Sequence, residues 1–217
     1  MKNNQLYKNY IKRIIDILVA VTFIVLFWWL LLIIAVLVRI NMGSPVLYTT
    51  ERVGKDERIF RIYKFRSMTN EVDENGVARV ILSQELLQSY QITDSETAAI
   101  VELPSLINVL KGELSIVGPR PLPVKYMPYY YDNERIRHSV NPGLTGWAQI
   151  NGRNAITWDH KFELDIEYVH NISFLFDIKV ILLTAWKVIK RSDIIQDDQQ
   201  TGSLYIVRKE MNRVEGD

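Results

Sequence analysis

The chain has 217 residues, enough for one ordinary domain or for a small domain with a membrane anchor. Its formal net charge is only +1, so the total charge gives no indication of a nucleic-acid partner. The absence of cysteine excludes disulfides, thiolate metal sites and cysteine nucleophiles, and the three histidines lack the spacing of a zinc site.

Residues 17–38 form an apolar block of about 22 residues that contains no charge, and Thr22 is its one clearly polar side chain. A helix of this length spans roughly 33 Å, close to the thickness of the hydrocarbon layer, so we expect it to insert into a membrane. A buried core helix is the alternative. A cleaved signal peptide fits poorly, because the block is too long and no small-residue cleavage site follows it.

Both flanks of the block are rich in cations, which draws both ends toward the cytoplasm. A helix that enters one leaflet, bends and returns would satisfy this bias better than a straight span. The block has no proline to produce such a bend, so the bend is a hypothesis. The adjacent Trp28 and Trp29 lie at its middle and favour a shallow path, because indoles prefer the membrane interface.

The soluble part is expected to begin at residues 41–45, where NMGSP is a turn signal. Residues 46–48 and 59–68 predict short strands, because in the second stretch apolar residues alternate with basic ones. Residues 69–101 are acidic and polar, and we interpret them as a loop with one helix.

The next segment predicts an apolar helix over residues 103–110, ended by Lys111 and Gly112, then a short strand and a rigid Gly-Pro-Arg-Pro turn. Residues 142–154 are rich in glycine and asparagine and fit exposed backbone amides near an anion.

Residues 174–191 combine a wide apolar face with four cations, which predicts either a core helix or a helix in the headgroup layer. The tail after Asp193 is polar and is expected to be loose. We predict an α/β fold dominated by helices, with a small sheet and several helices on the inner leaflet. The expected segments are a membrane anchor (1–44), a cytosolic domain (45–193) and a flexible tail (194–217).

Five motifs follow one another along residues 12–194: KRIIDI, RIYKFRSM, ELPSLINVLKGELSIVGPRP, RHSVNPGLTGWAQINGRN and FELDIEYVHNISFLFDIKVILLTAWKVIKRSDI. Together they resemble the bacterial sugar transferase family of monotopic phosphoglycosyl transferases. The resemblance implies a membrane enzyme that transfers a sugar phosphate from a UDP-sugar to undecaprenyl phosphate and releases UMP. It implies the bacterial cytoplasmic membrane, a catalytic domain facing the cytoplasm, contact with the lipid bilayer and with downstream glycosyltransferases, and no nucleic acid.

The resemblance also assigns roles to residues. The family has an Asp-Glu pair in which Asp attacks the sugar-linked phosphorus and Glu supports magnesium, and Glu102 matches that Glu. Arg120 and Arg153 are the expected phosphate contacts, followed by Lys64 of the YKF motif, because guanidinium and ammonium groups spread the developing charge. We expect Glu102, Arg120 and Arg153 to line one pocket. Four more residues are candidates: Arg137 and His138 for substrate contact or a structural role, and Lys12 and Arg13 for anchoring at lipid headgroups.

Two departures from the family are visible. Val101 stands where the nucleophilic Asp is expected, and valine has no lone pair with which to attack phosphorus. Residues 86–101 as a whole do not resemble the family. A compensated shift of reading frame would produce such a stretch. In the apolar block, Trp28 and Trp29 replace the family's Ser-Pro pair, which puts the re-entrant path in doubt.

Three hypotheses follow from Val101. The chain is a family member with impaired turnover; or Asp94 or Glu96 replaces the nucleophile; or the chain is a noncatalytic membrane scaffold that binds a UDP-sugar or a partner glycosyltransferase. A lone Glu102 would also bind magnesium more weakly than a pair of carboxylates.

Overall fold

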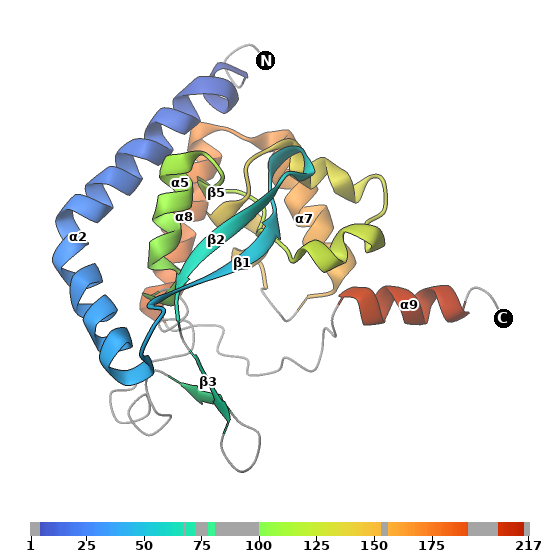
Figure 1. Ribbon diagram of the computed structural model, residues 1–217. Helices are drawn as coiled ribbons and strands as arrows, with labels where there is room; N and C mark the ends of the chain where they lie inside the picture. The colour runs from blue at the N-terminus through green and yellow to red at the C-terminus, as the bar shows by residue number, and fades with distance from the viewer. Residues whose placement is uncertain are drawn as a thin grey trace.

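The computed structural model describes residues 5–66, 68–72, 78–80, 100–152, 156–190 and 204–214. Helices dominate, and the strands are short, so the predicted helix-rich α/β class is confirmed (Figure 1). The helices are η1 (Tyr7–Ile11), α2 (Lys12–Met42), η2 (Lys55–Glu57), η3 (Leu103–Ser105), α5 (Leu106–Lys111), η4 (Val124–Tyr129), η5 (Glu134–Ser139), α6 (Trp147–Ile150), α7 (Trp158–Asn171), α8 (Phe174–Lys190) and α9 (Leu204–Val214).

The described strands form three pairs: antiparallel β1 (Leu47–Val53) with β2 (Ile59–Phe65), antiparallel β3 (Met68–Val72) with β4 (Ala78–Val80), and parallel β5 (Ser115–Val117) with β6 (Gly143–Thr145). The interpretation of residues 69–101 as a loop with one helix is therefore wrong for the strands β3 and β4. Asn75-Gly76, which lies between them in the sequence, is a strong hairpin signal that outweighs the polar composition. Residues 81–99 lie outside the described part.

The apolar helix α2 bends at Phe27, whose backbone angles of −116° and 15° are not helical (Figure 1). At the bend, the indole Nε1 of Trp29 donates to the carbonyl oxygen of Leu26 over 3.1 Å. Backbone groups freed by a kink in an apolar medium need such partners. The Trp29 side chain thus provides a hydrogen-bond donor for a backbone carbonyl group at the bend. A proline kink also leaves carbonyl groups that need such donors.

Both arms of α2 pack on the same globular part of the chain. Ala20 on the first arm lies in a cluster with Phe60 and Leu114, and Val38 on the second arm packs against Phe65. The outer side of the helix remains exposed and apolar, and α2 is long and apolar enough to cross a membrane by length and composition. An exposed apolar surface of this extent fits contact with lipid.

Helix α8 has the buried face that the core-helix alternative predicts, and its place in a headgroup layer stays a prediction. Val180 is fully buried in a core cluster with Val117 and Tyr168. On the other face, the side chains of Leu175 and Leu182 are 77% and 64% exposed. One face of α8 therefore belongs to the core, and the other presents apolar side chains at the surface.

The expectation of a loose tail is not met over residues 204–214, where the chain forms α9. Leu204 is fully buried with Tyr126 and Phe162, and Arg208, one turn later, is buried too. The polar composition concealed this pair, whose spacing of four residues places both on one helix face. The domain boundaries at residues 44 and 193 stay predictions.

Candidate functional site

The site is centred on the carboxylate of Glu102, at the start of the turn η3 that leads into α5. Pro104 favours the first turn of a helix because its φ is already fixed, and Ser105 Oγ donates to the Glu102 carbonyl oxygen. Lys64 Nζ lies 2.6 Å from Glu102 Oε1, and Arg120 Nη2 lies 3.5 Å from the same atom. Three separate segments thus meet at one carboxylate oxygen.

The position of Arg120 depends on a close backbone crossing at Gly118. Gly118 N donates to the Thr145 carbonyl oxygen over 2.9 Å, and a Cβ at Gly118 would lie only 2.5 Å from the Asn141 carbonyl oxygen. Only glycine fits such an approach. The buried Arg137 then donates from Nη2 to the carbonyl oxygen of Arg120 over 2.7 Å, which holds the Gly-Pro-Arg-Pro turn against the interior.

A cleft of about 190 Å³ lies at this junction. Cations, one carboxylate and two aromatic rings line it, together with apolar residues: Arg52, Lys64, Arg120, Glu102, Tyr126, Trp158, Ile62, Leu122, Leu144, Pro121, Pro123 and Gly143. Such a lining is suited to an anion with an attached organic group.

The electrostatics of the cleft keep Glu102 ionised. Burial alone would raise the pKa of the Glu102 carboxyl, but the positive charges of Arg120, Lys64 and Arg52 outweigh it and lower the pKa. Burial and the nearby charge of Arg120 lower the pKa of Arg52. The cleft therefore carries more positive than negative charge, and its potential favours a phosphate.

Magnesium does not fit the described residues as a protein-only site. Among the residues of the described ranges that line the cleft, Glu102 is the sole carboxylate, and its Oε1 already contacts Lys64. No group of three or more possible ligands is present in the part of the chain that the structure describes. Magnesium is normally held by one or two carboxylates together with substrate phosphates, so the described residues alone offer too few ligands.

The structure brings together three of the predicted site residues: Glu102, Lys64 and Arg120. Arg153 lies outside the described residues, as do Asp94 and Glu96. Val101 lies on the short helical turn before Glu102, is partly exposed and does not line the cleft.

Arg137 and His138 lie in the interior, and neither lines the cleft. Arg137 Nη2 and Nε lie 2.8 and 3.0 Å from Asp165 Oδ2. Burial and the charge of Arg137 lower the pKa of His138 to about 4, and its Nδ1 is 3.5 Å from Glu57 Oε1. These contacts support the structural role for both residues.

Lys12 and Arg13, expected at lipid headgroups, make contacts within the chain. Lys12 Nζ lies 2.6 Å from Asp177 Oδ2 on α8, and Arg13 donates to the carbonyl oxygens of Val109 and Leu110. They hold α2 against the domain, and their binding to headgroups stays a prediction.

Arg52, Tyr126 and Trp158 also line the cleft, although they were not predicted from the sequence. Arg52 is opposite Phe60 in the β1–β2 pair, and Tyr48 is opposite Lys64. Because side chains alternate along a strand, Arg52 and Lys64 share one face of the hairpin. The sequence could have indicated that Arg52 lies on the same face as Lys64, once strands 47–53 and 59–65 were paired. No comparable signal identified the two aromatic residues.

The chain matches the profile of the family described as bacterial sugar transferase over residues 7–191. The sugar transferase EpsL of Bacillus subtilis, described as uncharacterized, is 43% identical over 195 residues, which cover 90% of this chain and 95% of that protein. The UDP-glucose:undecaprenyl-phosphate glucose-1-phosphate transferase of Escherichia coli is 36% identical over 189 residues, covering 82% of this chain and 40% of that protein.

A third relative, the UDP-N-acetylgalactosamine-undecaprenyl-phosphate N-acetylgalactosaminephosphotransferase of Aeromonas hydrophila, is 37% identical, covering 81% of this chain and 43% of that protein. The chain thus spans nearly the whole Bacillus protein but less than half of the other two relatives. The matched region, residues 7–191, contains α2 and the whole described cleft. The chain belongs to the bacterial sugar transferase family.

Proposed function

We propose that the cleft at Glu102 binds the diphosphate of a UDP-sugar, as the donor of a sugar phosphate for undecaprenyl phosphate with release of UMP. The named activities of the Escherichia coli and Aeromonas hydrophila relatives support this proposal. The observation that carries it is the meeting of Lys64 and Arg120 at one carboxylate in a cleft. The reaction would begin the synthesis of an exopolysaccharide, a capsule or a glycoprotein glycan.

Arg120 and Lys64 are the two cations expected to contact the diphosphate, and they differ in exposure. The guanidinium of Arg120 is 55% exposed and free to turn toward a ligand, whereas Lys64 is 21% exposed and close to Glu102. We expect Arg120 to make the bidentate contact and Lys64 to share its charge between Glu102 and the ligand. Tyr126 and Trp158 offer ring faces to the uracil or the sugar.

The chemical step needs a nucleophile that Val101 does not provide. In the reaction that the resemblance implies, a carboxylate oxygen bonds to the sugar-linked phosphorus while the bond to UMP breaks. The lipid phosphate then displaces the carboxylate. We propose that this chain binds the donor but turns over slowly, because Val101 has no lone pair and Glu102 is engaged by two cations.

The setting of the reaction follows from α2. We propose that α2 enters one leaflet of the bacterial cytoplasmic membrane and returns, so that the domain faces the cytoplasm. The bend at Phe27 and the packing of both arms on one domain support this path over a straight span. Protease accessibility of tags at both ends of α2 in oriented vesicles tests it: both are cleaved from the same side, whereas a spanning helix gives opposite sides.

The test of function uses the full chain in nanodiscs. We expect UDP to bind, and UMP release from a UDP-sugar and undecaprenyl phosphate to be far below that of a Val101→Asp variant. Arg120→Gln weakens UDP binding, whereas Arg61→Gln, on the β1–β2 hairpin and 71% exposed, does not. Equal loss in both variants, or no UDP binding by the unaltered chain, refutes the proposal.

The same assay separates the alternatives. If Asp94 or Glu96 replaces the nucleophile, the unaltered chain releases UMP, and Asp94→Asn or Glu96→Gln abolishes the release. If the chain is a scaffold, UDP binds and Val101→Asp restores nothing. A magnesium requirement is a separate proposal, tested by UDP titration with and without the ion.

A further inference from the structure

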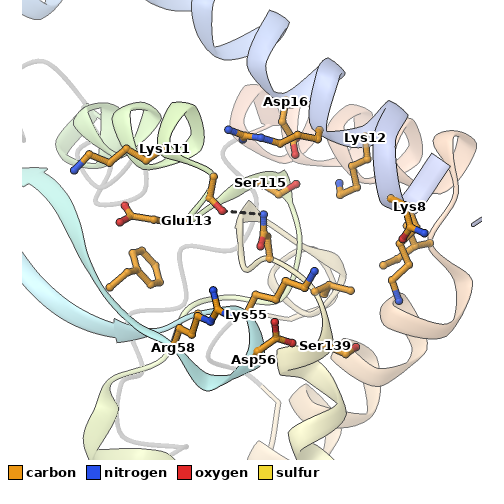
Figure 2. Close-up of a pocket in the computed structure, with 18 of the residues that line it drawn as sticks. Lys8, Lys12, Asp16, Lys55, Asp56, Arg58, Lys111, Glu113, Ser115 and Ser139 are labelled. Carbon is orange, nitrogen blue, oxygen red and sulfur yellow. Dashed lines mark hydrogen bonds between the residues drawn. The ribbon is translucent and has the colours of Figure 1, made fainter. Parts of the chain in front are cut away.

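A second cavity of about 750 Å³ lies beneath the first arm of α2, between that arm, the tip of the β1–β2 hairpin and the end of α5 (Figure 2). It shares no lining residue with the Glu102 cleft. Cations outnumber acids in its lining. The cations are Lys8, Lys12, Arg13, Lys55, Arg58 and Lys111, and the acids are Asp16, Asp56 and Glu113.

Half of these cations already have partners. Lys12 pairs with Asp177, Arg13 donates to the backbone of α5, and Lys111 Nζ donates to Tyr63 Oη over 2.8 Å. These contacts hold the three side chains in place, and Lys12 is the one paired with a carboxylate.

The other three cations differ. Within the described ranges of the chain, the side chains of Lys8, Lys55 and Arg58 form no ion pair or hydrogen bond. Lys8 comes from η1, whereas Lys55 and Arg58 come from the hairpin tip. Figure 2 shows Lys55 and Arg58 extending from the tip below the cavity, with Lys8 on the wall beside the helix.

The acids of the lining do not balance these charges. Asp16 Oδ1 accepts from Ile116 N over 2.9 Å, and Glu113 Oε2 accepts from Asn108 Nδ2 over 2.7 Å. With Asp56, the lining holds three carboxylates against six cations, so an excess of positive charge remains. Like charges gathered around a cavity repel one another, and an anion bound between them relieves that repulsion.

The hairpin tip is built in an uncommon backbone conformation. Asp56 and Glu57 have φ values of 54° and 58°, in the left-handed region that non-glycine residues seldom adopt. Glu57 is held there by Arg135, whose Nη1 lies 2.6 Å from Glu57 Oε1. Both Lys55 and Arg58, which flank these two residues, line the cavity (Figure 2).

We propose that this cavity binds a phosphate ester between Lys8, Lys55 and Arg58. Phosphate offers several acceptor oxygens, so ammonium and guanidinium groups from opposite walls contact it together. The cavity is large enough for a phosphate with an organic substituent. The ligand is either the headgroup of an anionic lipid, whose phosphate would lie beside the membrane helix, or a soluble phosphate ester.

The test is calorimetric titration of the detergent-solubilised full chain with two probes, dioctanoyl phosphatidylglycerol and inorganic phosphate. We expect binding by at least one probe and a loss of about tenfold or more in affinity in the double variant Lys55→Gln/Arg58→Gln. Arg61→Gln, an exposed cation on the same hairpin, is the matched control and retains the affinity. Stronger binding of the lipid assigns a headgroup, and equal or stronger binding of inorganic phosphate assigns a soluble phosphate ester.

Lys8→Gln, on the opposite wall, gives a second reading if the hairpin variant does not fold, and it too is expected to lose affinity. Arg120→Gln separates the two sites, because it weakens UDP binding, whereas the loss of probe affinity caused by Lys55→Gln/Arg58→Gln is the same with and without it. The proposal is overturned if neither probe binds the unaltered chain, or if Lys55→Gln/Arg58→Gln or Lys8→Gln binds as well as Arg61→Gln.

Discussion

Replacement of Arg208 by methionine tests how α9 is held on the domain. Arg208 Nη2 lies 2.5 Å from Glu134 Oε1 and 2.7 Å from Asp159 Oδ1, and its guanidinium is 3.8 Å from the centre of the Tyr131 ring. The side chains of Arg208 and Glu134 are each only 4% exposed, whereas Asp159 is 54% exposed. The pair with Glu134 therefore determines the effect. Removing one partner of a buried pair leaves an uncompensated charge, which costs about 3–5 kcal/mol.

The assay is chemical unfolding of the full chain in detergent, followed by tryptophan fluorescence. We expect Arg208→Met to lower the free energy of unfolding by about 3–5 kcal/mol, and the double variant Arg208→Met/Glu134→Gln to recover much of the loss. Lys209→Met, an exposed neighbour on the same helix, is the control. If Arg208→Met unfolds at the same denaturant concentration as the control, the pair does not hold α9 and the reasoning fails.

Three further outcomes follow from the cleft and its supports. His138 has a pKa of about 4 in the folded chain, compared with an ordinary value of 6.5. Between these two pH values the unfolded chain binds a proton that the folded chain does not. The contribution of His138 to stability is therefore complete above pH 6.5 and is lost as the pH falls toward 4. The decline is on the order of 3 kcal/mol, and identical unfolding profiles against pH for His138→Gln and the unaltered chain would contradict it. Glu102→Gln should bind UDP several-fold more tightly without magnesium, because a negative charge next to the diphosphate is removed; weaker binding in calorimetry counts against a direct phosphate contact. Gly118→Ala places a Cβ 2.5 Å from the Asn141 carbonyl oxygen and should cost about 1–3 kcal/mol and weaken UDP binding, whereas unchanged unfolding would show that the β5–β6 crossing is tolerant.

Sequence periodicity predicted the elements whose signals are local. The apolar block became α2, and Gly112 ends α5 with a φ of 86°, in the left-handed conformation that glycine favours. These two features could be predicted because each depends only on residues that are neighbours in the sequence. The bend at Phe27 is different, because the block has no proline to signal it and the hydrogen bond from Trp29 to Leu26 is seen only in the folded helix.

For the candidate site, the motifs predicted residues that the structure does bring together. Glu102, Lys64 and Arg120 do meet, although they come from different elements. Sequence spacing did not distinguish Arg120, which is half exposed in the cleft, from Arg137, which is buried below it with Asp165. Whether a cation faces a ligand or the interior depends on tertiary packing. The same reason hid Arg208, whose buried partners are distant in the sequence.

The contacts of α2 fix this helix to the rest of the protein, which limits how the domain can move if α2 lies in a membrane as proposed. A helix joined to its domain by a flexible linker would let the domain drift and rotate above the bilayer. Here Arg13 fastens one arm to α5, and Val38 packs the other arm against Phe65. On the membrane path proposed for α2, these contacts would set the depth and tilt of the cleft relative to the lipid, so the proposed water-borne donor and lipid-borne acceptor would arrive at a fixed height. Exchange of α2 for an unrelated membrane helix would keep the protein on the membrane and lose that alignment.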